Sequence, residues 1–334
     1  MKPGQCNPGL IVYGREMSMK ADVTIIGAAI LDVLAGPVNS DVFDTGSLPV
    51  NSTSLSFGGD ALNEAVVLSQ LGAKVELISK VGNDEAGKRV LDFLQEKQVD
   101  IAGVMVEDGL ETGINIVLVT PDSERVFLTN PNGSLRKLCE GDVTEQLGDV
   151  ADIVCMASMF VSPLLDVPAM ERIFQRIKSK PGRILVADMT TAKNGETLAD
   201  IEGILKYIDY IIPNETEAER LTGESDVYRN AELFLEHGAS CVIIKRGSKG
   251  CLIRTRERQI EVPAYAHAKL VDTTGAGDSF VAGFIRGLKN GMSLEECGRF
   301  GCAVASCTVE KMGANAAIES VDLPMRRYNE MVQG

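Results

Sequence analysis

The sequence predicts an α/β protein in which helices cover both faces of a mostly parallel sheet. Short, continuously apolar segments alternate with segments of helical periodicity, and strands that are apolar throughout are typical of sheets buried on both faces. Two stretches without helical periodicity interrupt this alternation and predict a small β-sheet outside the body of the molecule. At 334 residues the chain can bury a large core without disulfides or metal ions.

The predicted elements begin with an apolar run at residues 23–26, which ends at Gly27 as expected for a buried first strand. A helix is expected over residues 61–71, because the apolar residues there have helical spacing and Gly72 follows. The other expected strands are 75–81, 153–156, 184–187, 210–212 and 242–245, and the other expected helices are 85–97, 169–178 and 231–237.

The small β-sheet is predicted from two segments. Residues 36–57 are rich in polar residues and proline, and residues 111–130 contain two strand-like runs on either side of Pro121-Asp122-Ser123, as a hairpin would. We expect this sheet to be a lid over a site, or alternatively an edge hairpin of the main sheet. The predicted organisation is a flexible tail, residues 1–20, and one domain, residues 21–330.

Composition and charge exclude several classes of function. The chain has 33 Lys and Arg against 47 Asp and Glu, a net charge of −14, and such a surface repels nucleic acids and anionic membranes. It contains no run of 18 apolar residues that could cross a bilayer. Eight cysteines and two histidines lack zinc-ligand spacing, so we expect reduced thiols in a cytoplasmic protein.

Residues 271–280, Val-Asp-Thr-Thr-Gly-Ala-Gly-Asp-Ser-Phe, carry the strongest functional signal. Gly275, Ala276 and Gly277 precede a helical pattern, so unpaired N–H groups and the positive end of the helix dipole can bind an anion there. Asp278 lies in the same first turn and can act as a general base in a closed cleft. The alternative is that Asp278 only caps the helix.

A second segment begins at the paired glycines Gly58 and Gly59, where a ligand can approach the backbone closely. Asp60 and Asn63 lie three residues apart, on one face of the expected helix, and could both bind hydroxyl groups. The alternative is a turn in which Asp60 only interacts with the helix dipole.

Two further segments follow expected strands. Asn214 and Glu217 share one helical face and could hold the water shell of a Mg²⁺ ion near phosphates, or could simply cap a helix. Lys245, Gly247 and Gly250 belong to a loop of basic residues and glycines that suits a nucleotide, or is a plain basic turn.

Two common nucleotide-binding motifs are excluded. Residues 82–88 fit G-x-x-x-x-G-K, but Arg89 stands where a P-loop needs a Mg²⁺-binding Ser or Thr, and Asp84 and Glu85 would repel phosphate. The glycine-rich fingerprint of dinucleotide-binding oxidoreductases does not follow the first strand.

Together, and in this order, these segments resemble the ribokinase-like (PfkB) carbohydrate kinase family, from about residue 22 to residue 320. The most specific parts are residues 58–87 and 272–283, and the combination is closest to a bacterial subgroup of sugar kinases. The resemblance implies a three-layer α/β/α sandwich with a β lid. It also implies transfer of the γ-phosphoryl group of Mg-ATP to a hydroxymethyl group of a sugar, with K⁺ as a further expected cofactor.

The resemblance assigns roles to single residues. The implied catalytic residues are Asp278 as base and Gly275, Ala276 and Gly277 as anion hole. The expected substrate-binding residues are Asp32, Gly58, Gly59, Asp60, Asn63 and Asp278. The expected ATP-binding residues are Asn214, Lys245, Gly247, Gly250, Gly277 and Cys302. The expected metal-binding residues are Glu217 for Mg²⁺, through water, and Asp272, Thr274 and Gly313 for a monovalent cation.

The sequence departs from ribokinases at four positions. Ile30 stands in place of asparagine and Asp60 in place of lysine, Val161 falls where a ribose-binding carboxylate is expected, and Ala317 replaces the last serine of the cation loop. These departures argue against ribose as the substrate. The alternatives are a nucleoside kinase, in which Phe160 and Ile30 cover the base, and a sugar-binding sensor without turnover. We also expect a homodimer through the lid edges.

Overall fold

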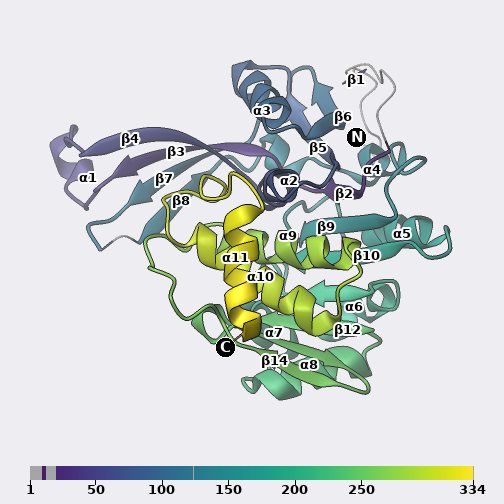
Figure 1. Ribbon diagram of the computed structural model, residues 1–334. Coiled ribbons are helices and arrows are strands. Elements are labelled where there is room, and N and C mark those ends of the chain that lie inside the picture. The colour runs from purple at the N-terminus through teal and green to yellow at the C-terminus, as the bar shows by residue number, and fades with distance from the viewer. Residues whose placement is uncertain (1–9, 13–19, 123, 334) are drawn as a thin grey trace.

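A ten-stranded sheet forms the centre of the protein in a computed structural model that describes residues 10–12, 20–122 and 124–333. Its strands are β1 (Leu10–Val12), β2 (Val23–Ile26), β5 (Val75–Gly82), β6 (Asp100–Glu107), β9 (Ile153–Met159), β10 (Ile184–Met189), β11 (Tyr210–Ile212), β12 (Cys241–Lys245), β13 (Cys251–Thr255) and β14 (Gln259–Val262). They lie in the order β1-β6-β5-β2-β9-β10-β11-β12-β13-β14 (Figure 1).

The middle of this sheet is parallel, as predicted. Every neighbouring pair from β6 to β12 in the spatial order is parallel. The edge strands β1, β13 and β14 are antiparallel to their neighbours. All the predicted strands are present, and β1, β6, β13 and β14 add to them. The strand β1 pairs with β6, so the prediction of a flexible tail over residues 1–20 is wrong for Leu10–Val12. Since the carboxyl ends of parallel strands meet at one edge of the sheet, residues that follow β10, β11 and β12 are brought together there.

Helices form a layer on each face of the sheet (Figure 1). One layer holds α2 (Asp60–Gln70), α3 (Glu85–Glu96), α9 (Ala276–Lys289) and α10 (Leu294–Thr308), with α11 (Asp322–Gln333) packed on α10. The opposite layer holds α4 (Glu140–Thr144), α5 (Val167–Lys178), α6 (Leu198–Leu205), α7 (Glu215–Thr222) and α8 (Val227–Glu236).

The two layers have separate hydrophobic cores because successive side chains of a strand point to opposite faces. On β9, Cys155 belongs to the core beneath α2 and α9, whereas Val154 and Met156 belong to the core beneath α5. The fold is therefore the expected α/β/α sandwich.

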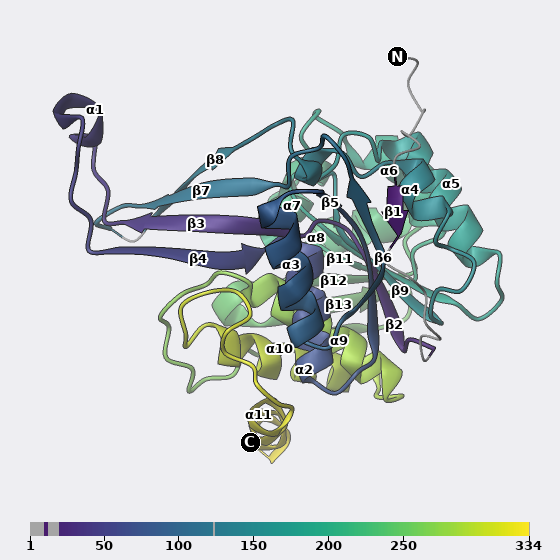
Figure 2. The same cartoon turned by 90° about the horizontal axis from the view of Figure 1, so that it is seen from above.

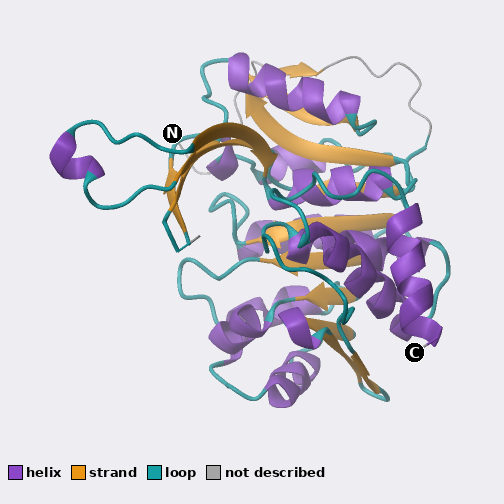
Figure 3. Cartoon of the chain, turned by 60° about the vertical axis from the view of Figure 1, so that its left-hand side comes forward, coloured by secondary structure: helices purple, strands orange, loops and turns teal. Residues whose placement is uncertain are grey.

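A second, four-stranded sheet projects from one side of this body (Figures 2 and 3). Its strands are β3 (Ile30–Gly36), β4 (Ser52–Gly58), β7 (Ile114–Val119) and β8 (Arg125–Thr129), in the order β4-β3-β7-β8, with the short helix α1 (Val42–Thr45) at its tip. It is a separate sheet rather than an edge hairpin of the main one. It also includes β3, which lies almost entirely before the predicted segment 36–57.

The cysteines differ in part from the expectation of reduced thiols. The free and buried cysteines are Cys155, Cys241, Cys251, Cys297, Cys302 and Cys307. Cys139 is disulfide-bonded, and Cys6 lies outside the described residues, as does most of the predicted tail 1–20. Within the described part of the chain, no helix is both long and apolar enough to cross a membrane.

Candidate active site

The predicted anion hole lies at the N-terminus of α9. Gly275 is the N-cap residue, with a left-handed φ of 73°, and a Cβ atom there would lie 2.5 Å from Ala314. Only glycine therefore fits this turn without displacing backbone. The N–H group of Ala276 donates to the carbonyl oxygen of Thr273 (3.2 Å). The N–H groups of Gly275 and Gly277 have no hydrogen-bond partner among the described residues. The Ala276 N–H group is thus bonded within the turn, and the role of these three residues as an anion hole stays a prediction.

Asp278 lies in the first turn of α9 and is held by a short chain of amides. Asn63 Nδ2 donates to Asp278 Oδ2 (2.7 Å), and Asn63 Oδ1 accepts from Asn315 Nδ2 (3.1 Å). The same Asn315 nitrogen donates to the carbonyl oxygen of Phe57 (3.3 Å). The two predicted residues, Asp278 and Asn63, are thus in direct contact, and Asn315 holds the Asn63 amide with its nitrogen toward the carboxylate and its oxygen away from it.

Asp278 belongs to an acidic cluster that also contains Lys245. Lys245 Nζ pairs with Asp188 Oδ1 at 2.6 Å, and both side chains are largely buried. Burial raises the pKa of Asp278 well above its ordinary value, and the neighbouring Asp60 carboxylate raises it further. The hydrogen bond from Asn63 and the charge of Lys245 act in the opposite direction. A carboxylate in this setting is a better proton acceptor near neutral pH than an exposed aspartate.

The other carboxylates of the cluster are shifted in the same direction. Burial raises the pKa of Asp60 to about 6, with a further contribution from Asp188. Burial also raises the pKa of Glu217 to about 7, although Lys245 opposes this shift. Glu64, from α2, is fully buried, and burial raises its pKa well above 4.5. The negative charge of this cleft is therefore not balanced by the side chains around it.

Asn214 and Glu217 form the N-terminal cap of α7, which was the predicted alternative to a role in binding Mg²⁺. Asn214 Oδ1 accepts from the N–H group of Glu217 (2.8 Å), and Glu217 Oε2 accepts from that of Asn214 (2.7 Å). The motif nevertheless lies in the cleft, because Asn214 forms a parallel β-bridge with Lys245. The Lys245 ammonium lies 3.5 Å from where a Cβ atom of Gly277 would be. Capping and participation in the site are thus compatible.

The predicted nucleotide loop follows β12. Gly247 and Gly250 have φ angles of 54° and 86°, and a Cβ atom at Gly250 would lie 2.0 Å from the carbonyl oxygen of Val262. Cys302, on α10, hydrogen-bonds to the thiol of Cys251, and this bond together with burial raises the pKa of Cys251. The expected ATP-binding residues Lys245, Gly247, Gly250 and Cys302 are therefore neighbours along one side of the cleft.

The lid sheet supplies the remaining predicted substrate residue. Asp32, on β3, accepts from Asn115 Nδ2 (3.0 Å), and Asn115 Oδ1 accepts from Thr129 Oγ1 (3.0 Å). Burial raises the pKa of Asp32, while Asn115 and Arg125 act in the opposite direction. A Cβ atom at Gly58 would lie 2.3 Å from Asp32 Oδ2, so glycine is required beside this carboxylate.

The three residues predicted to bind a monovalent cation lie together, and the guanidinium group of Arg125 pairs with the carboxylate among them. Asp272 Oδ1 accepts from the N–H (3.0 Å) and hydroxyl (2.7 Å) groups of Thr274. Asp272 Oδ2 accepts from the N–H group of Gly313 (2.9 Å) and pairs with Arg125 Nη2 (2.7 Å). A carboxylate has about four lone-pair sites. Since four donors engage Asp272, its carboxylate has no free lone pair for a potassium ion, and K⁺ binding by this loop stays a prediction.

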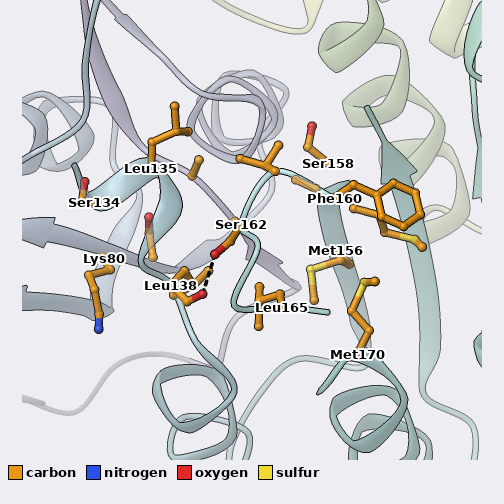
Figure 4. A pocket seen from close by; sticks show the side chains of 16 residues that line it. Lys80, Ser134, Leu135, Leu138, Met156, Ser158, Phe160, Ser162, Leu165 and Met170 are labelled. Carbon is orange, nitrogen blue, oxygen red and sulfur yellow. Dashed lines mark hydrogen bonds between the residues drawn. The ribbon is translucent and has the colours of Figure 1, made fainter. Parts of the chain in front are cut away.

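Two cavities lie beside the loop that follows β9. The smaller has a volume of about 20 Å³, and Ser162, in its wall, donates to the carbonyl oxygen of Leu138 (2.8 Å; dashed in Figure 4). The larger has a volume of about 340 Å³ and lies between this loop, the end of β8 and the loop after β10. Phe160 and Val161 line both cavities, and the backbone of Phe160 has a left-handed φ of 75°.

Several residues of the site were not predicted. Asp188 and Asn115 carry weak sequence signals, a carboxylate at the end of a buried strand and an amide within an apolar one. Glu64, Arg125 and Asn315 carry none, because each is a common residue type at an unremarkable position and becomes significant only through a contact distant in sequence. Glu64 contacts Cys155, Arg125 contacts Asp272 and Asn315 contacts Asn63.

The arrangement combines a basic carboxylate, free helix N-terminal donors and a lysine ammonium around the first turn of α9. This set can deprotonate an alcohol and stabilise negative charge that develops beside it, as a group-transfer reaction requires.

Comparison with known proteins identifies the family. The profile described as pfkB family carbohydrate kinase matches residues 20–321. A ribokinase of Haemophilus influenzae is 30% identical over 306 residues, covering 90% of this chain and 96% of the relative. An uncharacterized sugar kinase of Archaeoglobus fulgidus is 34% identical over 260 residues, covering 76% and 99%. A solved structure of Arabidopsis thaliana ribokinase complexed with ribose and ATP has a TM-score of 0.79 and 24% identity, covering 93% of this chain and 99% of that chain.

The chain therefore belongs to the pfkB family of carbohydrate kinases. It is a phosphotransferase that uses an alcohol group as acceptor. The ribokinase fold and the family both agree with the resemblance based on residues 58–87 and 272–283.

Proposed function

We propose that the protein transfers the γ-phosphoryl group of Mg-ATP to a hydroxymethyl oxygen of a sugar or sugar derivative. The observation that carries this proposal is the position of Asp278 in the first turn of α9, next to the unpartnered N–H groups of Gly275 and Gly277. A base and an anion-binding turn on adjacent residues suit an alcohol that attacks a phosphoryl group.

In this mechanism Asp278 accepts the proton of the acceptor hydroxyl as its oxygen bonds to the γ-phosphorus. The bond between the γ-phosphorus and the bridging oxygen of ADP breaks, and its electron pair stays on ADP. The free N–H groups of Gly275 and Gly277 and the ammonium group of Lys245 stabilise the charge on the transferred group. Asn63 keeps Asp278 in place. The lid excludes water, a competing nucleophile.

Magnesium fits the charge of this cleft. Asp60, Glu217 and Asp278 all have raised pKa values with burial as the main cause, and Lys245 is already paired with Asp188. A divalent cation that arrives with the triphosphate would offset this excess of negative charge. We propose that Asn214 and Glu217 hold it through water. Bound there, Mg²⁺ would neutralise phosphate charge and orient the triphosphate.

The proposal is tested by substituting the base. The variant Asp278→Asn keeps the shape of the side chain but cannot accept a proton, and we expect kcat to fall by roughly 10²-fold or more. Coupled ADP-release assays measure turnover, and calorimetry with ATP and with the acceptor checks that both affinities are retained. Normal turnover of this variant would remove Asp278 from the mechanism.

The substrate is sought with a panel of sugars, sugar acids, sugar phosphates and nucleosides in the presence of Mg-ATP. NMR then locates the phosphorylated carbon. Turnover of nucleosides alone would favour a nucleoside kinase, in which Phe160 beside the cavities covers the base. Binding without transfer to any acceptor would favour a sensor. We place the protein in the cytoplasm, where ATP is available, and cell fractionation tests this.

A further inference from the structure

Two cationic side chains line the cavity of about 340 Å³. They are Arg136, which follows the lid strands, and Lys193, in the loop after β10. A space of this size matches a small-molecule site. Phe160 and Pro131 give part of its wall an apolar character, while Thr129 and Asn194 add polar groups.

Neither cation forms an ion pair within the described part of the chain. Arg136 Nη1 donates to the carbonyl oxygen of Val161 (2.7 Å), which is the one hydrogen bond of the guanidinium among the described residues, so the rest of its fork is available. No described carboxylate forms an ion pair with Lys193. In a protein with 47 acidic and 33 basic side chains, two unpaired cations at one cavity are a departure from the general surface.

The acidic residues that line the same cavity have other partners. Asp166 Oδ1 caps α5 by accepting from the N–H group of Ala169 (2.9 Å). Both oxygens of Glu196 accept from Asn194, from its backbone N–H (3.0 Å) and its side-chain amide (2.9 Å). The two acidic side chains thus accept from amide donors beside them, whereas the two cations keep N–H donors that a ligand could use.

The cavity adjoins the acceptor side of the cleft through two separate connections. Thr129, in its wall, begins the hydrogen-bond chain through Asn115 to Asp32. Lys193 lies within electrostatic range of Asp60: partial burial and the charge of Arg136 lower the pKa of Lys193, and Asp60 opposes both. A ligand that spans the cavity and the cleft could present a hydroxyl group to Asp278 and another group to the two cations.

We propose that Arg136 and Lys193 bind an anionic substituent of the acceptor, so that the substrate is a phosphorylated or carboxylated monosaccharide rather than a neutral sugar. This inference rests on the proposed function and adds the substrate class to it. The planar fork of an arginine matches both phosphate and carboxylate groups, whereas Lys193 adds a point charge.

The experiment compares binding of acceptors that differ in charge. Calorimetry without nucleotide measures the affinities of D-fructose 6-phosphate and D-fructose, and of D-gluconate and D-glucose. We expect the charged member of at least one pair to bind about tenfold more tightly or better, as charge-assisted hydrogen bonds would provide. The pair that shows the preference distinguishes a phosphate from a carboxylate substituent.

Variants then test which side chain causes the tighter binding of the charged acceptor. Arg136→Met should remove most of it while leaving the affinity for the neutral sugar unchanged, and Arg136→Lys should restore only part of it. Lys137→Met is the matched control, because it removes one positive charge at the adjacent position, which does not line the cavity. This control should retain the preference.

Three results would overturn the proposal. They are equal affinity within both pairs, an undiminished preference in Arg136→Met, and an Arg136→Met variant whose KM rises for ATP instead of for the acceptor. The last would make the cavity a site for nucleotide phosphates. Binding is measured without nucleotide, so it tests this subsite separately from the reaction. If the protein binds anionic sugars but phosphorylates none of the acceptors, the proposed reaction is wrong and the proposed subsite is not.

Discussion

At the scale of single residues, the site contains charged groups whose burial lowers the stability of the folded protein. Asp60, Glu217 and Asp278 are buried close together and share one lysine with Asp188. Such clustering lowers stability but keeps carboxylates basic enough to accept protons or attract a cation. Gly275 shows the same principle in the backbone, since its left-handed conformation turns donors toward the cleft.

The acidic cluster should make stability fall as the pH rises. Asp60 and Glu217 have folded-state pKa values of about 6 and 7, above their ordinary values of 3.8 and 4.5. The folded state therefore holds these protons more tightly than the unfolded state, so their stabilising effect is complete below about pH 4 and is lost by about pH 7. At pH 8 the free energy of unfolding of Asp60→Asn should then exceed that of wild type by on the order of 1–3 kcal/mol.

Urea titrations at pH 4 and pH 8 measure this difference, which should nearly vanish at the lower pH. Asp44→Asn, at an exposed position of the lid, is the control and should have no effect at either pH. A stabilisation by Asp60→Asn that is the same at both pH values would contradict the electrostatic origin.

The backbone of the anion hole can be tested at Gly275. Gly275→Ala forces a side chain into a left-handed residue and against Ala314, 2.5 Å away. We expect a loss of roughly 2–5 kcal/mol in the free energy of unfolding, together with a loss of kinase activity. Gly291→Ala is a matched control: its φ is 71°, but no atom lies within 4 Å of the added Cβ. This control should lose only about 1–2 kcal/mol. Equal losses would show that the contact with Ala314 is unimportant.

At the scale of elements, one ion pair joins the lid to the catalytic helix. Arg125 begins β8, and Asp272 lies in the turn that leads into α9. Both side chains are largely buried, so the pair is a more effective link than a surface salt bridge. The guanidinium also places a positive charge beside this turn.

The kinase reaction should therefore proceed without potassium. Activity in buffers without alkali cations should not change when potassium chloride is added. Arg125→Met should lower kcat by roughly ten- to a hundredfold, because the turn before the anion hole loses its partner. Potassium should then partly restore activity. Arg256→Met, at an exposed position, is the control. Strict dependence of the wild-type enzyme on potassium would contradict this account.

At the scale of the whole molecule, the lid leaves an apolar row exposed. Leu55, Ile116 and Leu128 lie in one row across the lid sheet with Val33 between them, and they are 53%, 44% and 51% exposed. The opposite face of the sheet carries Asp32 and faces the cleft. An apolar sheet face of this kind favours association of two copies.

We expect wild type to have the mass of a dimer in light scattering, and Leu128→Glu to be a monomer, because it places a charge in the apolar row. Phe43→Glu is the matched control, since Phe43 is 88% exposed at the tip of the lid but outside this row. A monomeric mass for wild type would refute the dimer.

The sequence by itself predicted six of the ten strands of the main sheet, the layers and the central motifs. Apolar runs such as 153–156 and glycine-rich turns such as 275–277 are local features, because strand burial and turn conformation depend on neighbouring residues. The resemblance carried by residues 58–87 and 272–283 added the family, which the comparisons confirm, and predicted roles for Asp278 and Lys245. The segments predicted for the lid did not include β3. The apolar pattern of Ile30–Gly36 is equally typical of a strand in the main sheet.

The tertiary structure decided which residues meet. Asn315 reaches Asn63, Arg125 reaches Asp272, and Lys193 approaches Asp60 across large separations in sequence. No local pattern encodes such contacts, because they arise from the packing of loops at the carboxyl edge of the sheet. The same packing raised the pKa values of the acidic cluster, since burial depends on all the surrounding elements and not on the sequence next to each carboxylate.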